Sequence, residues 1–138
     1  MIWFQLKCLG VIFIRIKIKG YLKNITDNEV IEFEEKGIKN KDKITYTNDG
    51  VKTTIKIDGN KVMLIRDGSD FINTFVFDKK NSSCNYFLKE NNYDVDIDIN
   101  TLNIDINDDS IYIKYFIIDS NIEYEYKLEM SDVNEYKK

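Results

Sequence analysis

Apolar and polar side chains alternate along most of the chain. In segment 51–58, Val51, Thr53, Ile55 and Ile57 share one face, while charged residues and a threonine occupy the other. A repeat of two residues is typical of a β-strand, whose successive side chains point to opposite faces. The same alternation predicts strands in segments 11–19, 30–38, 43–47, 51–58, 62–66, 71–77, 95–99, 102–106, 111–118 and 122–130. No segment carries a convincing helical period.

Turn signals separate these segments. Gly and Asn supply the positive φ that tight hairpins require. A phase slip marks a further turn, because Ile99 and Leu102 are three residues apart, and this predicts a turn at Asn100-Thr101. The other predicted turns are Asn48-Asp49-Gly50, Asp58-Gly59-Asn60, Asp67-Gly68 and Asn107-Asp108-Asp109-Ser110.

Turns at intervals of about 8–12 residues between half-apolar strands predict an all-β protein. One apolar and one polar face per strand is typical of antiparallel sheets. Closing such a sheet into a barrel removes exposed edges. We therefore predict a single antiparallel β-barrel of about eight to ten strands.

Charge narrows the class of partner. The 138 residues include 20 Lys and Arg and 24 Asp and Glu, a formal net charge of −4. An acidic chain is poorly suited to nucleic acid or to an anionic membrane, both of which attract basic surfaces. We expect neither as a partner.

The residue types present narrow the chemistry. The chain has no His, which excludes His-based triads and His-ligated metal sites. Phosphate-binding loops and nucleophile-elbow motifs are also missing. Asp94, Asp96, Asp98 and Asp105 resemble a calcium loop in spacing, but the alternating Val95 and Ile97 favour a solvated strand face. We expect no enzyme activity, no cofactor and no metal site.

Cysteine usage and the N-terminus bear on location. Cys8 and Cys84 are the only thiols, and their wide spacing predicts neither a disulfide framework nor a zinc site. The apolar start, residues 1–14, is interrupted by Gln5, Lys7 and Gly10 and is shorter than a membrane span. We expect a cytoplasmic protein.

Several segments resemble the YwiB-like family of small bacterial proteins. They are Gly50-Val-Lys-Thr-Thr-Ile-Lys-Ile57, Val62-Met-Leu-Ile-Arg-Asp-Gly68, Phe75-Val-Phe77, Asp94-Val-Asp-Ile-Asp-Ile-Asn-Thr101 and Ile111-Tyr-Ile-Lys-Tyr-Phe-Ile-Ile118. The chain departs from the family before Asp94, where Lys89-Glu-Asn-Asn-Tyr93 replaces a Thr-Pro-Tyr-Gly-like turn. The resemblance implies a domain of unknown function with a calycin or lipocalin-like barrel and an interior cavity. Because it begins near Ile12, we expect an extension at residues 1–10, the barrel at 11–130 and a tail at 131–138.

Arg66 is the most informative polar residue. It follows Val62 and Leu64 at the strand period, so it is expected to point into the barrel near one end. An interior guanidinium binds a ligand carboxylate through two parallel hydrogen bonds. Two structural alternatives stay open. Either Met63 and Ile65 are the inward pair, or Arg66 closes the barrel end by pairing with an acid.

Four other residues complete the candidate ligand site. Thr53, Asn73 and Tyr86 are polar but in phase with apolar neighbours, and Tyr46 belongs to an excess of tyrosines that suits a binding surface. In a cavity their polar groups hydrogen-bond a ligand. In a filled barrel they bond to one another or to buried water, and the tyrosines pack as core.

Two functional hypotheses follow from these residues. In the first, the barrel binds a small apolar or amphipathic ligand with an anionic group held by Arg66. In the second, a filled barrel acts through protein contacts, with a homodimer as one form. An apolar cavity of about 300 Å³ or more that Arg66 faces favours the first. A packed interior with an apolar outer patch favours the second.

Overall fold

The computed structural model describes residues 13–133. The expected extension at residues 1–10 lies outside the described residues, as does most of the expected tail. The described residues form eleven strands and no helix, and so contain no helix long and apolar enough to cross a membrane. The strands are β1 (Ile14–Asn24), β2 (Glu29–Asn40), β3 (Lys43–Asn48), β4 (Val51–Asp58), β5 (Lys61–Asp67), β6 (Phe71–Phe77), β7 (Ser83–Leu88), β8 (Tyr93–Ile97), β9 (Ile99–Ile106), β10 (Ser110–Ile117) and β11 (Ile122–Asp132).

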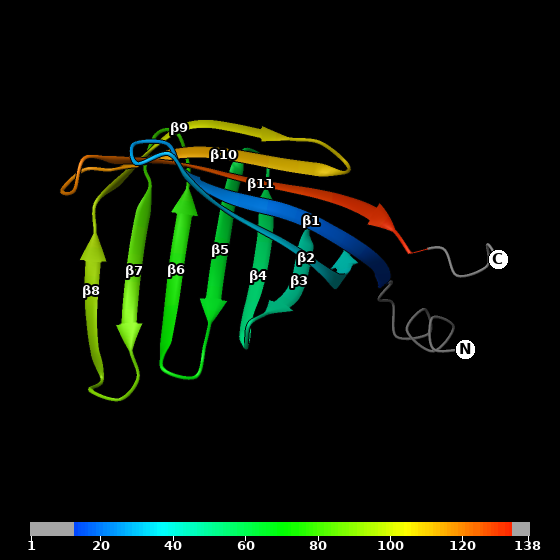
Figure 1. The fold of residues 1–138 in the computed structure, drawn as a ribbon, viewed down its shortest axis with the longest axis horizontal. Coiled ribbons are helices and arrows are strands. Elements are labelled where there is room, and N and C mark those ends of the chain that lie inside the picture. The colour runs from blue at the N-terminus through cyan, green and yellow to red at the C-terminus, as the bar shows by residue number, and fades with distance from the viewer. Residues whose placement is uncertain (1–12, 134–138) are drawn as a thin grey trace.

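All eleven strands belong to one antiparallel sheet. Their order is β8-β7-β6-β5-β4-β3-β2-β1-β11-β10-β9. The sheet curls over itself, so that β1, β11, β10 and β9 cross the upper ends of β4 to β8 (Figure 1). Strands β8 and β9 are its two edges, and β9 packs across β6 and β7. This nearly closed antiparallel barrel confirms the predicted fold class, with one strand more than the range expected.

Two tight hairpins form at the predicted glycine turns. Asp49 and Gly50 have φ values of 53° and 78° between β3 and β4, and Gly59 has φ of 63° between β4 and β5. Side chains other than Asn and Asp adopt this region only with strain, which is why these residue types occur there. The chain also turns at Asp67-Gly68, between β5 and β6, as predicted.

The predicted turn at Asn100-Thr101 is wrong. Strand β9 runs straight through these residues, and the chain changes sheet edge at Asp98 instead. Opposite β10, Thr101 aligns with Tyr115 and Asn103 aligns with Lys114, so one residue has no partner. The phase slip is therefore a β-bulge, which inserts one extra residue into a continuous strand. The bulge leaves Leu102 exposed.

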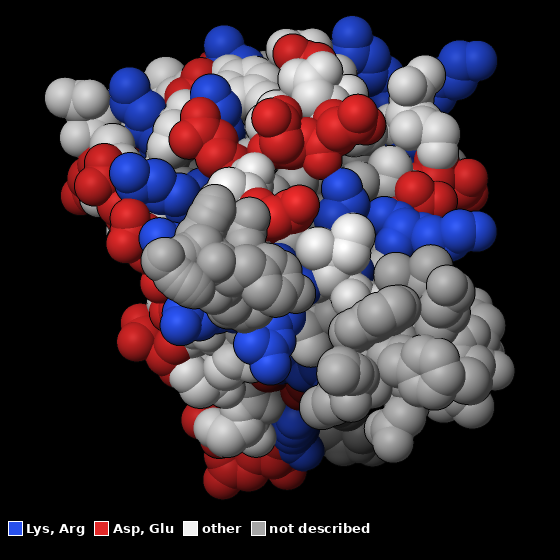
Figure 2. Space-filling model, turned by 90° about the vertical axis from the view of Figure 1, so that its right-hand side faces the viewer, with Lys and Arg blue, Asp and Glu red and all other residues white. Residues whose placement is uncertain are grey.

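The core lies where the two halves of the sheet cross. Inward residues from both halves are fully buried, and a side-chain bond joins the halves at one end, where the hydroxyls of Ser82 and Thr101 lie 2.6 Å apart. The outward positions are mostly polar, with Lys and Arg interspersed among Asp and Glu on the described part of the face in Figure 2. The largest fully buried side chains are Phe77, Ile16, Ile18, Ile44, Ile55, Ile111, Ile113, Leu128 and Val62.

Candidate functional site

One cavity enters the interior of the barrel. Its volume is about 290 Å³. Ile31 and Arg66 are exposed and mark its mouth, whereas Thr53, Leu64 and Phe77 are buried and form its inner wall. The cavity is lined by Leu22, Ile31, Phe33, Tyr46, Asn48, Val51, Thr53, Leu64, Arg66, Phe75, Phe77, Tyr115 and Tyr126.

The five predicted site residues form one row across the sheet. Consecutive Cα partners on strands β3 to β7 are Tyr46, Thr53, Arg66, Asn73 and Tyr86. Directly opposed residues have Cβ atoms about 4.5–5.5 Å apart, so each member is a neighbour of the next. The adjoining inward row is Ile44, Ile55, Leu64, Phe75 and Cys84. A polar row therefore borders the apolar core.

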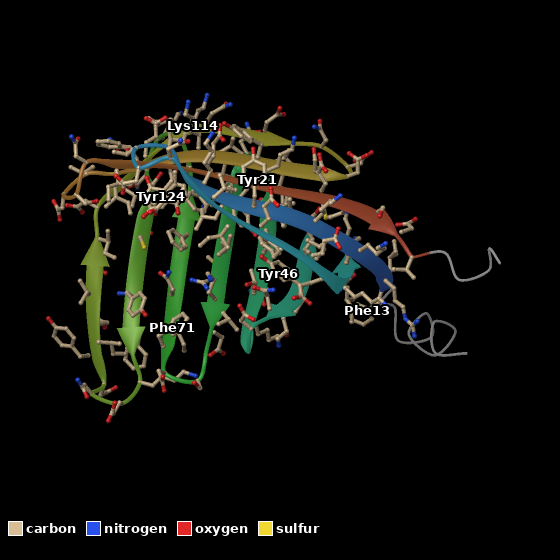
Figure 3. The ribbon with its side chains drawn as sticks, viewed as in Figure 1. Phe13, Tyr21, Tyr46, Phe71, Lys114 and Tyr124 are labelled. Atoms are coloured by element: carbon tan, nitrogen blue, oxygen red, sulfur yellow. The ribbon has the colours of Figure 1, made fainter. Side chains whose placement is uncertain are left out.

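The cavity takes in only one end of this row. Tyr46, Thr53 and Arg66 line it. Asn73 and Tyr86 continue the row away from it, and each has a partner there. The Asn73 side-chain oxygen accepts a hydrogen bond from the Cys84 thiol at 3.6 Å, and the Tyr86 ring stacks on Phe71 at 5.3 Å (Figure 3 labels Phe71 and Tyr46).

Arg66 lies on the inward face of β5. Val62 and Leu64 are buried on that face, whereas Met63 and Ile65 are half-buried on the other, which excludes the alternative inward pair. The guanidinium carbon lies 5.6 Å from the centre of the Phe71 ring. This is within the range of a cation–π contact.

No acid pairs with Arg66 among residues 13–133. None of the ion pairs between described residues, at the 4.0 Å limit, involves Arg66. Glu35 on β2 accepts a hydrogen bond from the Asn48 side chain at 2.5 Å. The alternative in which Arg66 closes the barrel end through an acid is therefore not observed, and the guanidinium keeps its donors available at the cavity mouth.

Comparison with known proteins places the chain in a family. A family model described as a domain of unknown function (DUF1934) matches residues 16–136. The chain belongs to this family. The resemblance to YwiB-like proteins drawn from the sequence is thus confirmed. No curated protein matches the chain.

The DUF1934 barrel is also similar to a solved structure, the ywiB protein from Bacillus subtilis. The two share 17% sequence identity with a TM-score of 0.66, over 93% of this chain and 99% of that one. At this identity the similarity establishes the fold alone.

Two buried tyrosines meet at the cavity wall of this DUF1934 domain. The hydroxyl oxygens of Tyr46 and Tyr126 lie 2.9 Å apart, so one donates to the other. Burial raises the pKa of both phenols, and the nearby positive charge of Arg66 acts in the opposite direction. The pair is therefore neutral at physiological pH. The hydrogen bond between the two hydroxyls gives each of them a partner inside an apolar wall.

The buried phenols predict a loss of stability in alkali. Burial also raises the pKa of Tyr115. An unfolded chain ionises its tyrosines near pH 10, while the folded chain holds these protons to higher pH. The unfolded state then binds fewer protons, so stability falls as pH rises above about 10, by up to about 1.4 kcal/mol per pH unit for each such group. We expect a constant melting temperature from pH 7 to about 8 and a slight fall between pH 8 and 10, because burial also raises the pKa of the Cys84 thiol to about 11. Beyond pH 10 the tyrosines make the decline steep.

Differential scanning calorimetry across this range measures the decline. Tyr115→Phe removes one buried phenol and is expected to make the decline shallower. Tyr93→Phe, at an exposed position, controls for loss of a hydroxyl. A decline of equal steepness in the two variants contradicts the assignment.

Residues of the opposite wall were missed by sequence reasoning. Tyr115 on β10 and Tyr126 on β11 line the cavity. The sequence counted them only in the general excess of tyrosines, for which core packing was the default, and did not assign them to the candidate site. Their signal is their phase, since Tyr115 follows Ile111 and Ile113, and Tyr126 precedes Leu128, all of them buried. The strand period shows which residues point inward, but it does not show which of the inward residues border a cavity.

Gly20 positions Phe33 at the cavity. A Cβ atom at Gly20 would lie 2.6 Å from Cζ of Phe33 and 2.8 Å from Cδ2 of Leu128. Without a side chain there, the Phe33 ring lies over β1 and stacks on Tyr46, with ring centres 5.5 Å apart. The glycine thus shapes one aromatic wall.

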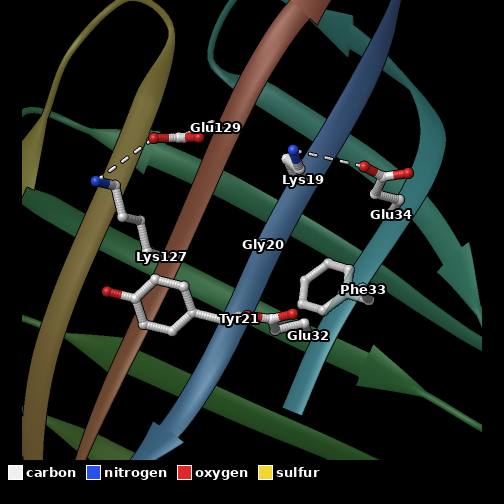
Figure 4. Close-up of a pocket in the computed structure, with 8 residues that line it drawn as sticks. All are labelled: Lys19, Gly20, Tyr21, Glu32, Phe33, Glu34, Lys127 and Glu129. Atoms are coloured by element: carbon white, nitrogen blue, oxygen red, sulfur yellow. Dashed lines mark ion pairs between the residues drawn. The ribbon is translucent and has the colours of Figure 1, made fainter. Parts of the chain in front are cut away.

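Two larger grooves lie on the outer face of β1. Their volumes are about 580 and 800 Å³. The first, shown in Figure 4, is bordered by charges that already pair with each other, Lys19 with Glu34 at 3.7 Å and Lys127 with Glu129 at 3.5 Å. Lys19 and Glu34 are highly exposed, and such pairs contribute little. We therefore assign the candidate site to the smaller interior cavity.

The acidic segment before β9 forms a strand, as its alternation predicts. On β8, Asp94 and Asp96 are exposed, and Asp96 accepts a hydrogen bond from the Asn85 side chain at 2.9 Å. Within residues 13–133, no three Cys, Asp or Glu side chains come close enough together to hold a metal ion.

Proposed function

We propose that this barrel binds a small organic anion, whose apolar part enters the interior cavity and whose anionic group contacts Arg66. One observation carries the proposal. An arginine without an acidic partner stands at the mouth of a cavity of about 290 Å³ whose lining is mainly apolar. The volume lies just below the usual range for ligand cavities, about 300–1,000 Å³.

The physical case for an anion begins with the guanidinium. It stays charged at every physiological pH and carries five donors in a planar fork that matches a carboxylate. The structure shows no hydrogen bond from the guanidinium to another described residue, only its contact with the Phe71 ring. Its row neighbour Thr53 adds a second polar side chain to the cavity lining. With a net charge of −4, the protein attracts an anion locally rather than at long range.

The proposed role is binding without a chemical step, cofactor or metal. We propose that the protein acts in the cytoplasm and that its partner is a small molecule rather than a nucleic acid or a membrane. The acidic composition supports this choice, as does the mixture of both charge signs on the outer surface (Figure 2).

A second function, contact with another protein, has one specific observation in its favour. Strand β8 is a sheet edge that carries the exposed apolar side chains of Tyr93 and Val95. Edge strands of this kind pair with other chains. A homodimer through β8 is the simplest form, and size-exclusion chromatography with light scattering tests it, with a monomer at high concentration as the opposing result.

The anion hypothesis is tested with Arg66→Met, which keeps most of the side-chain bulk and removes the fork. We expect it to weaken binding of undecanoate by about 1.5–3 kcal/mol, the scale of hydrogen bonds to a charged group. Binding of the neutral 1-undecanol is expected to change much less. Isothermal titration calorimetry measures both.

Lys52→Met is the matched control, because Lys52 is an exposed cation on the other face of the adjacent strand. It is expected to leave both affinities unchanged. Equal losses for acid and alcohol in Arg66→Met would show that Arg66 shapes the barrel rather than recognising an anion. Absence of binding by the unaltered protein would contradict the proposed function altogether.

A further inference from the structure

The walls of the interior cavity are unusually aromatic. Six of its thirteen lining residues carry rings, contributed by β2, β3, β6, β10 and β11. They are Phe33, Tyr46, Phe75, Phe77, Tyr115 and Tyr126.

These rings hold one another in fixed orientations. Phe75 and Phe77 stack with centres 5.2 Å apart and planes 13° apart, and Tyr115 is tilted against Phe77 at 5.0 Å and 48°. Phe33 stacks on Tyr46 in the same manner. Rings have few rotatable bonds and pack here in pairs, so the cavity has rigid, flat-sided walls.

The deep wall presents few polar groups to a ligand. Its polar side chains are Thr53 and the tyrosines Tyr46, Tyr115 and Tyr126. The Tyr46 and Tyr126 hydroxyls bond to each other. The only charged group on the lining is Arg66 at the mouth. A matching ligand is therefore mainly apolar in its buried part and anionic at one end.

The volume limits the size of that buried part. A cavity of about 150 Å³ accommodates benzene, or about 25 Å³ per carbon atom. At that density, the volume of about 290 Å³ holds about 11 or 12 non-hydrogen atoms. Two fused rings fit this limit, as does an alkyl chain of similar carbon number, so volume alone does not choose between them.

The shape of the walls favours fused rings over an alkyl chain. We propose that the ligand is an aromatic monocarboxylate of one or two fused rings, with the ring system between the aromatic walls and the carboxylate on Arg66. A flat ring makes offset and edge contacts with Phe33, Phe75 and Tyr115 without losing internal freedom. An alkyl chain must give up its rotational freedom to lie between fixed rings. This inference rests on the proposed anion-binding function and narrows its ligand class.

The test compares two acids of equal size. 2-Naphthoate and undecanoate each have eleven carbon atoms and one carboxylate, but the first is flat and rigid and the second is a flexible chain. Titration calorimetry on the unaltered protein is expected to show 2-naphthoate binding at least about tenfold more tightly. Undecanoate binding equally or more tightly overturns the ring assignment while leaving the proposed anion site intact.

A pair of variants tests whether the walls cause the preference. Phe75→Leu replaces a ring of the cavity wall by an aliphatic group and is expected to reduce the preference for 2-naphthoate to about threefold or less. Phe87→Leu, on the outward face of β7, is the matched control and is expected to retain the full preference. A preference that survives Phe75→Leu unchanged contradicts the assignment to these walls.

Failure of the underlying function gives a different result. If neither acid binds, or if Arg66→Met weakens 2-naphthoate and its neutral amide equally, the anion site itself is wrong. The proposed preference for an aromatic ligand is then wrong as well.

Discussion

Ile55→Asp is expected to abolish folding, whereas Lys56→Asp is expected to leave the protein intact. Ile55 is completely buried in the middle of β4, with Ile44 and Leu64 as its cross-strand partners. A carboxylate there has no hydrogen-bonding partner and costs several kcal/mol. This is comparable with the total stability of a domain, about 5–15 kcal/mol.

Lys56 is the matched position on the other face of the same strand, where it is exposed. Substitutions at such positions usually change stability by about 0.5 kcal/mol or less. Circular dichroism and thermal melting of both variants measure the contrast. Equal melting temperatures would show that the inner and outer faces of β4 are exchanged.

Leu128→Ala is expected to destabilise the protein by about 2–5 kcal/mol, and Leu102→Ala by about 0.5 kcal/mol or less. Leu128 is fully buried on β11, opposite Gly20 and Ile111. Truncation there removes apolar contacts and leaves a cavity that the surrounding rings and isoleucines cannot fully close.

Leu102 undergoes the same substitution with a different expected result. It is the unpaired residue of the β9 bulge, and its exposed fraction is 46%. Urea denaturation of both variants measures the difference. A large loss in Leu102→Ala would place this side chain in the core, as the uninterrupted alternation with Ile104 and Ile106 suggests, and would contradict the bulge.

Much of the fold could be predicted because a strand's faces are defined locally. Residues two apart point the same way whatever the partner strand, so Ile55 was expected inside and Lys56 outside. The Asp49-Gly50 and Gly59 turns were also predictable, since positive φ restricts the residue type at one position. The Leu102 bulge was not, because a break in alternation has the same appearance in a turn and in a bulge. The pairing with β10 distinguishes the two, because Thr101 pairs with Tyr115 and Asn103 pairs with Lys114, which leaves Leu102 unpaired within a continuous strand.

The candidate site, too, could be predicted from the sequence only in part. Arg66 could be expected at an inward position near a strand end from Val62 and Leu64 alone. The distinction between Thr53, which lines the cavity, and Asn73, which does not, required the positions of the crossing strands. Gly20 also had no local signal, because its role depends on the Phe33 ring from the next strand.

That the chain is all-β, and which face of most strands points inward, followed from the sequence, whereas the inward position of Arg66 was one of the alternatives left open. Those properties follow from the two-residue period and from backbone angles that only certain residues adopt. The tertiary structure alone decided that Tyr46, Thr53 and Arg66 share a cavity with Tyr115 and Tyr126. Strand register and barrel closure bring together segments about fifty or more residues apart. The space left between them depends on how all their side chains pack at once.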